Sequence, residues 1–184
     1  EDLFFAALGG DSRVDGALTT PSDALAALRH APTRVLVACP LMHGTAQWVT
    51  LGALLSGGTV VVFTEDAFDA DELLDLAERE RVAQLVVVGD AFAVPLADAL
   101  DAQPDRWQLD DLVAVASGGA SLAPETARRL LAHLPGAVVV DGYGTSETGG
   151  HARRIHIPGA PASGAAFTPG TDTALIGFDG TVVP

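Results

Sequence analysis

Short apolar runs alternate with longer amphipathic stretches along residues 34–140 of the chain. The apolar runs are rich in valine and lack polar alternation, which is typical of strands buried on both faces of a parallel sheet. We expect such strands at 35–38, 59–63, 85–88, 112–116 and 137–140. The stretches between them predict helices at 47–55, 69–81, 91–100 and 124–133, the third of them broken near Pro95. This alternation predicts an α/β fold, a parallel sheet covered by helices.

The pattern divides the chain into three parts. Residues 1–33 predict an irregular, partly helical lead-in, with a short helix at 21–28. Residues 34–150 hold the regular α/β pattern, and residues 151–184 form a third part of different texture.

The third part is rich in Pro, Gly and Ala, and residues 153–170 predict an extended loop. Two short strands are expected after it, at 173–176 and 181–183, around the turn Phe178-Asp179-Gly180. We interpret them as the start of a further subdomain that the chain does not complete.

The composition is that of a globular, acidic protein. Of the 184 residues, 48% are hydrophobic and the mean hydropathy is +0.32. The 10 basic and 24 acidic side chains give a formal net charge of −14 and a pI of about 4.4. Nonspecific nucleic-acid binding and electrostatic docking on anionic lipid both need basic surface, so the charge argues against them. An anionic ligand would therefore have to be held locally, by backbone N–H groups and a metal ion.

The chain has one cysteine, Cys39, so no intrachain disulfide can form, which fits a reducing, cytoplasmic compartment. No apolar run approaches the roughly 20 residues of a membrane span. The chain starts at Glu1 without a methionine or a signal-peptide pattern, which indicates an internal fragment or a processed start.

Glycines dominate the signature segment, Asp141-Gly-Tyr-Gly-Thr-Ser-Glu-Thr-Gly-Gly150, which follows the last expected strand. The ring of Tyr143 offers a face for a planar base, the hydroxyl of Ser146 suits a phosphate oxygen, and the carboxylate of Glu147 suits Mg²⁺. Open α/β sheets bind ligands at such carboxyl ends of strands. Taken alone, Tyr143 fits a half-buried core position equally well, and Ser146 also fits the cap of a helix that starts at Glu147.

A second glycine-rich strand end, the glycine loop, Ser117-Gly-Gly-Ala-Ser-Leu122, lies shortly upstream. Its residues Gly118, Gly119, Ala120 and Ser121 precede a helix, where free N–H groups gather and a flat base or an anion can approach the backbone. An isolated segment of this kind fits better a tight turn that needs glycine for its dihedral angles. Its pairing with Tyr143 at the next strand end favours ligand binding.

The glycine loop and the signature segment, together with Pro40-Leu-Met-His43 after another strand, resemble the adenylate-forming superfamily, and acyl-CoA synthetases in particular. The glycine loop resembles that family's adenine-binding loop. Tyr143-Gly-Thr-Ser-Glu147 resembles its tyrosine–glycine–any–threonine–glutamate motif, with Ser146 in the threonine place. The resemblance covers the chain up to about residue 150, in the order and approximate spacing of the family, and weakens after that.

The resemblance implies a role for each segment. Adenine would lie between the glycine loop and the signature, contacting Gly118, Gly119, Ala120 and Ser121 on one side. On the other side it would contact Asp141, Gly142, Tyr143 and Gly144. Ser146 would bind phosphate and Glu147 would bind Mg²⁺, and these two are the catalytic candidates. His43 and Thr145 would lie beside the carboxylate and the acyl chain.

The implied activity is that of an ATP-dependent acyl-CoA ligase. A carboxylate attacks the α-phosphate of ATP, giving an acyl-adenylate and pyrophosphate, and the CoA thiol then displaces AMP. Val87-Val-Gly-Asp-Ala-Phe-Ala-Val-Pro-Leu96 resembles a segment of bacterial fatty-acyl and steroid-acid CoA ligases, which favours a long or polycyclic acid.

Three parts of the family pattern have no match in this chain: the Ser/Thr/Gly-rich phosphate loop that ends in lysine, the ribose-binding aspartate and the C-terminal domain with its catalytic lysine. The chain therefore resembles the middle of the large domain. We expect it to be inactive alone and, with apolar surface left uncovered, to favour a homodimer.

Several interpretations stay open at this level. His43 fits a buried, satisfied histidine as well as a site residue, and core packing is favoured for Trp48. Arg153 and Arg154 are expected in a solvated loop more than at a phosphate. His151 and His156 have no cysteine or acid beside them and are weak metal ligands.

Two other functional classes also fit. One is a noncatalytic nucleotide-binding module. The other is an unrelated doubly wound domain whose glycine-rich turns are only structural.

Overall fold

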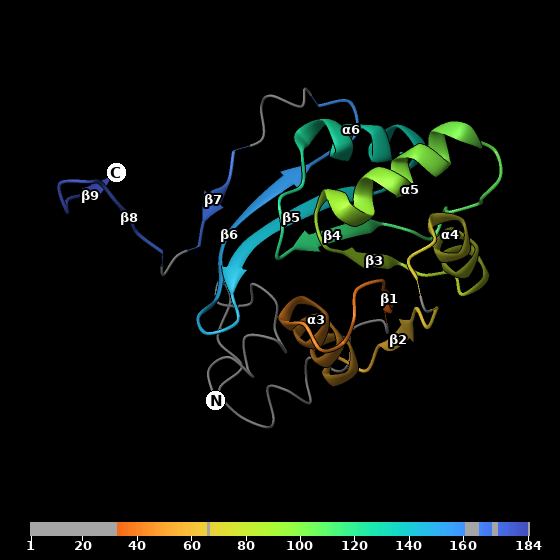
Figure 1. The fold of residues 1–184 in the computed structure, drawn as a ribbon, viewed down its shortest axis with the longest axis horizontal. Coiled ribbons are helices and arrows are strands. Elements are labelled where there is room, and N and C mark those ends of the chain that lie inside the picture. Colours follow the sequence, from red (N-terminus) through yellow and green to blue (C-terminus); the bar gives the residue numbers. More distant parts are fainter. Residues whose placement is uncertain (1–32, 66, 161–165, 171–172, 184) are drawn as a thin grey trace.

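The computed structural model describes residues 33–65, 67–160, 166–170 and 173–183. Figure 1 shows strands and helices that alternate as the sequence predicts. The strands of the main sheet are β1 (Arg34–Val37), β2 (Thr59–Val62), β3 (Gln84–Val87), β4 (Ala114–Gly118), β5 (Val138–Thr145), β6 (Gly149–His156) and β7 (Thr168–Pro169). The described helices are α3 (Gly44–Leu55), α4 (Ala70–Arg79), α5 (Asp90–Ala102) and α6 (Pro124–His133). The predicted α/β fold is confirmed, and the helix expected at 21–28 lies outside the described residues.

The sheet has seven strands in the order β2-β1-β3-β4-β5-β6-β7. The first five strands are parallel, and β6 and β7 join antiparallel to their neighbours. From β1 the chain passes through α3 to β2, and then crosses back through α4 to β3 on the other side of β1. Connections that leave neighbouring strands in opposite directions open a crevice at their carboxyl ends, which is where doubly wound sheets bind ligands.

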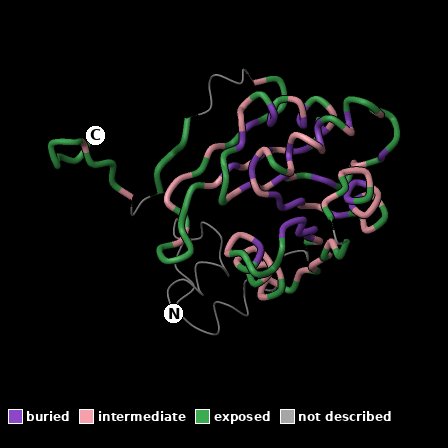
Figure 2. Tube along the Cα trace, in the orientation of Figure 1, coloured by how far each residue is buried: buried purple, intermediate pink, exposed green. Residues whose placement is uncertain are grey.

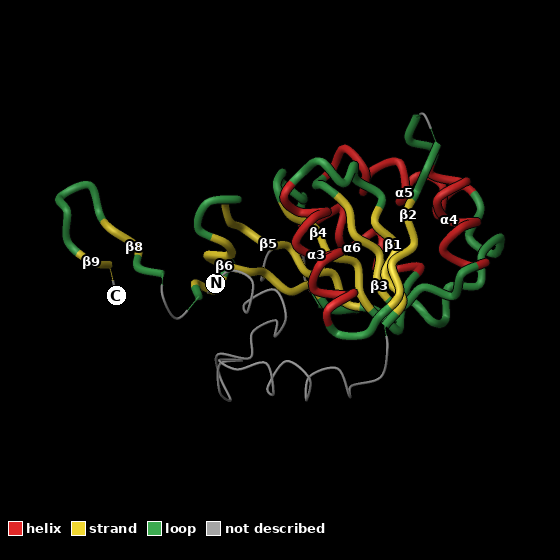
Figure 3. Tube along the Cα trace, turned by 90° about the horizontal axis from the view of Figure 1, so that it is seen from below, coloured by secondary structure: helices red, strands yellow, loops and turns green. Residues whose placement is uncertain are grey.

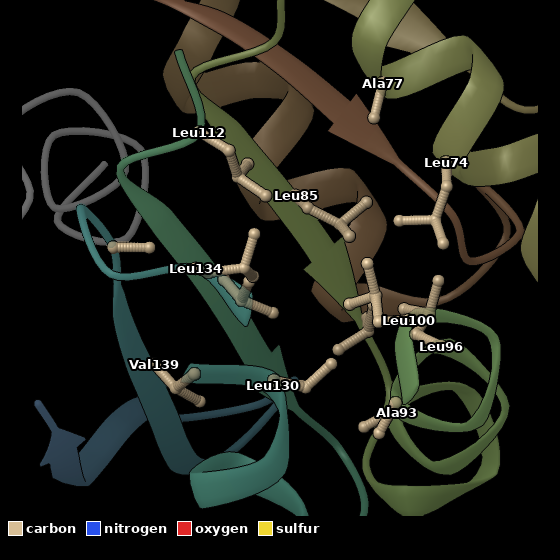
Figure 4. Packing of buried hydrophobic residues seen from close by; sticks show 14 of the residues in the cluster. Leu74, Ala77, Leu85, Ala93, Leu96, Leu100, Leu112, Leu130, Leu134 and Val139 are labelled. Atoms are coloured by element: carbon tan, nitrogen blue, oxygen red, sulfur yellow. The ribbon is translucent and has the colours of Figure 1, made fainter. Parts of the chain in front are cut away.

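Two hydrophobic clusters, one on each face of the sheet, hold the helices in place. Leu36, Leu85, Val115 and Val139 pack with the apolar sides of α4, α5 and α6 in the larger cluster (Figure 4). The alternate strand positions Val35, Val37 and Val86 pack with Ala46 of α3 in the smaller one. Successive strand residues point to opposite faces, so both faces bury valine or leucine, which explains the unbroken apolar runs. Figure 2 shows this buried interior along the parallel strands.

The prediction of an extended loop over residues 153–170 is wrong for its first part. β5 continues through the signature to Thr145, and the chain turns at Ser146–Thr148 and returns as β6 along the free edge of β5. The helix cap considered for Ser146 is therefore also wrong, because Ser146 and Glu147 lie in a turn. Pairing with an open strand edge satisfies the backbone of His151–His156, a long-range gain that local hydrophobicity does not reveal.

The predicted break near Pro95 is also wrong. α5 runs from Asp90 to Ala102 with Pro95 inside it. Proline removes one backbone hydrogen bond, but Ala93, Leu96, Ala97 and Leu100 of this helix are buried between α4 and α6. Burial of that apolar face offsets the lost bond.

Two short strands, β8 (Leu175–Ile176) and β9 (Val182–Val183), pair antiparallel as the sequence predicts. They form a two-stranded sheet separate from the main one (Figure 3), and their apolar side chains are exposed. None of the helices that the structure describes has the length and apolar character needed to traverse a bilayer.

Candidate functional site

A pocket of about 890 Å³ lies at the carboxyl ends of the parallel strands. Segments far apart in the sequence line it: the end of β1, the first turns of α3, the end of β3, the loop after β4 and the turn between β5 and β6. Its volume suits a small organic ligand, for which typical pockets measure about 300–1,000 Å³.

Most of the predicted site residues meet in this pocket. The lining includes His43, Gly118, Gly119, Gly142, Tyr143, Gly144, Thr145 and Ser146. Ala120 and Ser121 are exposed in the glycine loop but do not line the pocket, and Glu147 lies exposed in the adjoining turn. The side chain of Asp141 is buried behind the pocket and does not reach it.

The signature segment forms a tight hairpin that requires glycine at position 144. A Cβ on Gly144 would overlap the carbonyl oxygen of Gly149, so only glycine fits where the two strands approach. The register shifts between Tyr143 and Gly144, a bulge that re-aims the strand at the pocket. Tyr143 is 62% exposed, so its ring keeps a face open to a ligand.

Hydrogen bonds within the turn fix its shape. The hydroxyl of Thr145 accepts the N–H of Thr148 at 3.2 Å and lies 2.7 Å from the Thr148 hydroxyl. That hydroxyl in turn lies 2.6 Å from Nε2 of His151. Glu147 is thereby held at the tip of an ordered turn, with its carboxylate in solvent.

The first turn of α3 provides a positive end to the pocket. His43 is its N-cap and gives no side-chain cap, and no acidic residue lies in the first turn. The free N–H groups and the helix dipole therefore favour a negative ligand atom here. Ser146 reaches the same place, because a Cβ on Gly44 would lie 2.7 Å from its Oγ.

The glycine loop forms a further wall of the pocket, next to the first turn of α3. Gly119 has φ of +87°, which glycine adopts without strain, and a Cβ there would press to 3.2 Å from the Thr45 hydroxyl. Asp90, at the start of α5, fixes the loop from one side: its N–H donates to the carbonyl of Ser121 at 2.9 Å, and its carboxylate accepts the N–H of Ala123 at 3.0 Å. Sequence reasoning missed this role of Asp90, because the contacts join backbone atoms about thirty residues away.

Apolar side chains also line the pocket: Cys39, Trp48, Val88 and Phe92. Trp48 therefore lines the pocket, whereas the sequence favoured a place in the core for it. Burial raises the pKa of the Cys39 thiol, so this residue stays uncharged and acts as a small apolar wall.

Arg153 and Arg154 lie in β6 and not in a loop, which corrects the sequence prediction. Arg153 lines the pocket, whereas Arg154 points to the opposite face and forms an ion pair with Asp141. His156 is buried in the same strand, and no cluster of three His, Cys, Asp or Glu side chains suited to a metal occurs in the part of the chain that the structure describes.

A family model described as AMP-binding enzyme matches residues 16–184 of the chain. The chain is 39% identical over 181 residues to the medium-chain acyl-CoA ligase Mig of Mycobacterium avium, which covers 97% of this chain and 32% of that protein. It is 36% identical over 151 residues to a medium/long-chain-fatty-acid–CoA/3-oxocholest-4-en-26-oate–CoA ligase of Mycobacterium tuberculosis, with 81% of this chain and 27% of that protein covered.

Solved structures share the fold. The amide bond synthetase McbA of Marinactinospora thermotolerans superposes with a TM-score of 0.70 at 25% identity, over 88% of this chain and 32% of that one. The N-terminal domain of FACL13 of Mycobacterium tuberculosis superposes with a TM-score of 0.65 at 22% identity, over 88% of this chain and 41% of that one. The chain spans about a third of the length of the curated relatives it matches.

Proposed function

The chain belongs to the AMP-binding enzyme family, and from that premise we propose that the protein of which it forms part is an ATP-dependent acyl-CoA ligase. It joins a carboxylic acid to AMP with release of pyrophosphate and then transfers the acyl group to CoA. The observation that carries the proposal is the single pocket that unites His43, the glycine loop and the signature segment. The ligase names of the relatives at 39% and 36% identity support it.

Adenine lies between the Gly118–Gly119 backbone and the open ring of Tyr143. Bare glycine backbone lets a flat base approach closely, and stacking on an aromatic ring contributes about 1–3 kcal/mol per base. Asp141 takes part only through its backbone, because its carboxylate is used behind the pocket.

The α-phosphate lies at the first turn of α3, where the free N–H groups and the hydroxyl of Ser146 meet. These donors hold the phosphate in place and stabilise the negative charge that grows on it during attack. His43 and Thr145 flank the same point from the α3 and β5 sides and orient the incoming carboxylate.

The residues present suit Mg²⁺ that arrives with ATP. Glu147 is one exposed carboxylate at the pocket edge, and Mg²⁺ is commonly held by one or two carboxylates together with substrate phosphates. When bound, the ion supplies charge neutralisation at the phosphates. Glu147 provides its protein ligand from a turn that Thr145, Thr148 and His151 keep ordered.

The acid is a fatty or steroid-like carboxylic acid. Its carboxylate meets the phosphate at His43, and its apolar body lies against Cys39, Trp48, Val88 and Phe92. The acids in the names of the relatives, a medium-chain acid and a cholestenoate, match an apolar lining of this kind. The reaction takes place in the reducing cytoplasm, which suits the free thiol of Cys39.

Because the chain spans 32% of its relative Mig, we expect the 184 residues alone to be inactive, and we expect them to associate as a homodimer through exposed apolar surface. Carboxylate-dependent ATP–pyrophosphate exchange by the full-length protein tests the proposal, with short, long and steroid-like acids and Glu147→Ala as the comparison. Exchange that selects one class of acid and collapses in the variant is expected. Nucleotide binding without exchange for any acid, in a well-folded protein, would instead identify a noncatalytic module.

A further inference from the structure

A row of polar side chains lies directly behind the pocket. The sheet register pairs Ser117 of β4 with Asp141 of β5, and Asp141 with Arg154 of β6. All three side chains are largely buried: Ser117 is 6% and Asp141 3% exposed, and the side chain of Arg154 is 13% exposed. They face α5 and α6, because Val115 and Val139, two positions earlier in the same strands, belong to the cluster under those helices.

The neighbouring row on the opposite face consists of Gly118, Gly142 and Arg153, all of which line the pocket. The two rows are one residue apart along each strand, so a movement of the buried row moves the pocket wall with it. Burial of polar side chains lowers the stability of the fold unless they form hydrogen bonds. The hydrogen-bond partners of this row therefore show which segments it holds together.

Arg154 joins two segments that both contribute to the pocket. Its Nη2 donates to Oδ2 of Asp141 at 2.7 Å, at the start of the signature, and to the carbonyl oxygen of Leu122 at 2.7 Å, at the end of the glycine loop. Its guanidinium also lies 4.7 Å from the centre of the Phe167 ring. Charge-assisted hydrogen bonds of this kind are the strong ones, and here a single nitrogen of the guanidinium serves both acceptors.

The glycine loop is held by hydrogen bonds from several sides. Gly118 pairs with Gly142 through the sheet, and the hydroxyl of Ser117 accepts the N–H of Gly89 at 3.0 Å. Asp90 binds Ser121 and Ala123 from the α5 side, and Arg154 binds Leu122 from the β6 side. The buried Leu122 anchors the end of the loop in the large hydrophobic cluster, but Gly118, Gly119, Ala120 and Ser121 have small side chains that add little packing. The position of this middle part relative to the signature segment therefore depends strongly on the hydrogen bonds of Asp90 and Arg154.

The charge balance of this buried group also depends on Arg154. Burial, followed by the positive charge of Arg154, lowers the pKa of the neighbouring His156, so His156 is neutral at neutral pH. Arg154 is then the cation that compensates Asp141 on this side of the sheet, within the described residues.

We propose that Arg154 is a positioning residue that sets the gap between the glycine loop and the signature segment, and thereby the affinity for the adenine of ATP. The proposal rests on the proposed function for the identity of the ligand, but the tie between the two segments stands on the geometry alone. It assigns Arg154 no contact with substrate.

The test uses the full-length protein with Arg154→Lys and Arg154→Met. Lysine keeps a positive charge beside Asp141, but its side chain is shorter than that of arginine, so its ammonium group is not expected to reach Asp141 and the carbonyl of Leu122 together. This variant is expected to fold even if the methionine variant, which leaves Asp141 unpaired, does not. Arg128→Met is the matched control, because Arg128 is an exposed arginine of α6 paired with Glu125.

In ATP–pyrophosphate exchange, Arg154→Lys is expected to raise the KM for ATP by about 3- to 30-fold, the range typical of residues that act through others. The KM for the acid should stay near its wild-type value, and Arg128→Met should change neither constant. Amide hydrogen exchange is measured in parallel and needs no activity: residues 119–123 should exchange faster in Arg154→Lys, while α5 and α6 keep their protection.

Two results would overturn the proposal. One is wild-type exchange of residues 119–123 in a folded Arg154→Lys protein. The other is an equal rise in the KM for ATP and for the acid, which a general loss of structure would produce. A wild-type protein without any ATP–pyrophosphate exchange contradicts the proposed function and leaves the amide-exchange result to decide the role of Arg154.

Discussion

The two faces of the sheet carry different kinds of side chain. Under α4, α5 and α6 lies a dense cluster of leucine, valine and alanine, with nearly complete burial of residues such as Leu36, Leu96 and Leu130. The pocket side, beyond α3, presents glycine, hydroxyl groups and an exposed tyrosine. The first face contributes stability through the large apolar area that it removes from water, whereas the second buries only a smaller apolar cluster and leaves room for the pocket. Changes on the two faces should therefore affect different measurements.

The largest effect is expected in the core. Leu96→Ala removes a side chain that is 1% exposed between α4 and α6, and should lower the free energy of unfolding by about 2–5 kcal/mol. Urea denaturation of the full-length protein measures it. Leu54→Ala is the control, because Leu54 is 53% exposed on α3, and it should cost much less. Equal losses for the two variants would contradict the location of the core.

A change on the pocket side should impair the reaction and leave the stability of the fold nearly unchanged. Gly144→Ala introduces a Cβ that collides with the carbonyl of Gly149 and displaces the signature segment. Adenylation should fall about 100-fold, since displacement of a reacting group by about 1 Å costs on that order. The midpoint of thermal unfolding should change little, because the hairpin lies outside the large cluster.

Gly136→Ala provides the matched control for Gly144→Ala. A Cβ at Gly136 meets nothing within 4 Å, and this glycine is not among those with positive φ. Its ATP–pyrophosphate exchange should equal that of the wild type. A Gly144→Ala protein with normal exchange would show that the hairpin geometry is not needed for the reaction.

A smaller effect on stability, without any effect on the pocket, is expected at the start of α4. The carboxylate of Asp69 accepts the N–H of Glu72 at 3.0 Å and caps α4. Asp69→Ala should cost about 0.5–2 kcal/mol of unfolding free energy, and Asp69→Ser should restore most of it. The KM values should stay unchanged in both variants, because α4 contributes nothing to the pocket lining.

The smallest effect is a change in pH dependence at His156. Its pKa is lowered in the folded protein by burial, so folding disfavours its protonation. This contribution to stability is fully present above the unfolded-state pKa of about 6.5 and is lost as the pH falls below that value through the folded-state pKa. His156→Leu should flatten the stability profile over that window, as measured by urea denaturation at several pH values. An unchanged slope would contradict a neutral, buried His156.

The same contrast explains what the sequence could predict. Periodicity located β1 to β5 and α3 to α6 because burial on both faces leaves a local record in the valine runs and leucine faces. The motif residues His43, Gly118 and Tyr143 were also found, and the structure brings them into one pocket.

The missed features all depend on distant backbone. β6 pairs with the free edge of β5, and the glycine loop is fixed by Asp90. Arg154 lies in β6, where a loop was predicted, and its side chain binds Asp141. Nothing in the sequence around these residues indicates the partner. Trp48 was misassigned for a related reason, because an aromatic side chain on an apolar helix looks the same whether it faces a core or a pocket.

The most direct test of the proposed adenine site is a crystal structure of the full-length protein with a non-hydrolysable acyl-adenylate analogue. We expect the adenine ring to stack on Tyr143 against the Gly118–Gly119 backbone, with the phosphate mimic at the first turn of α3 beside Ser146. An adenine bound elsewhere, with this pocket free of ligand, would contradict it.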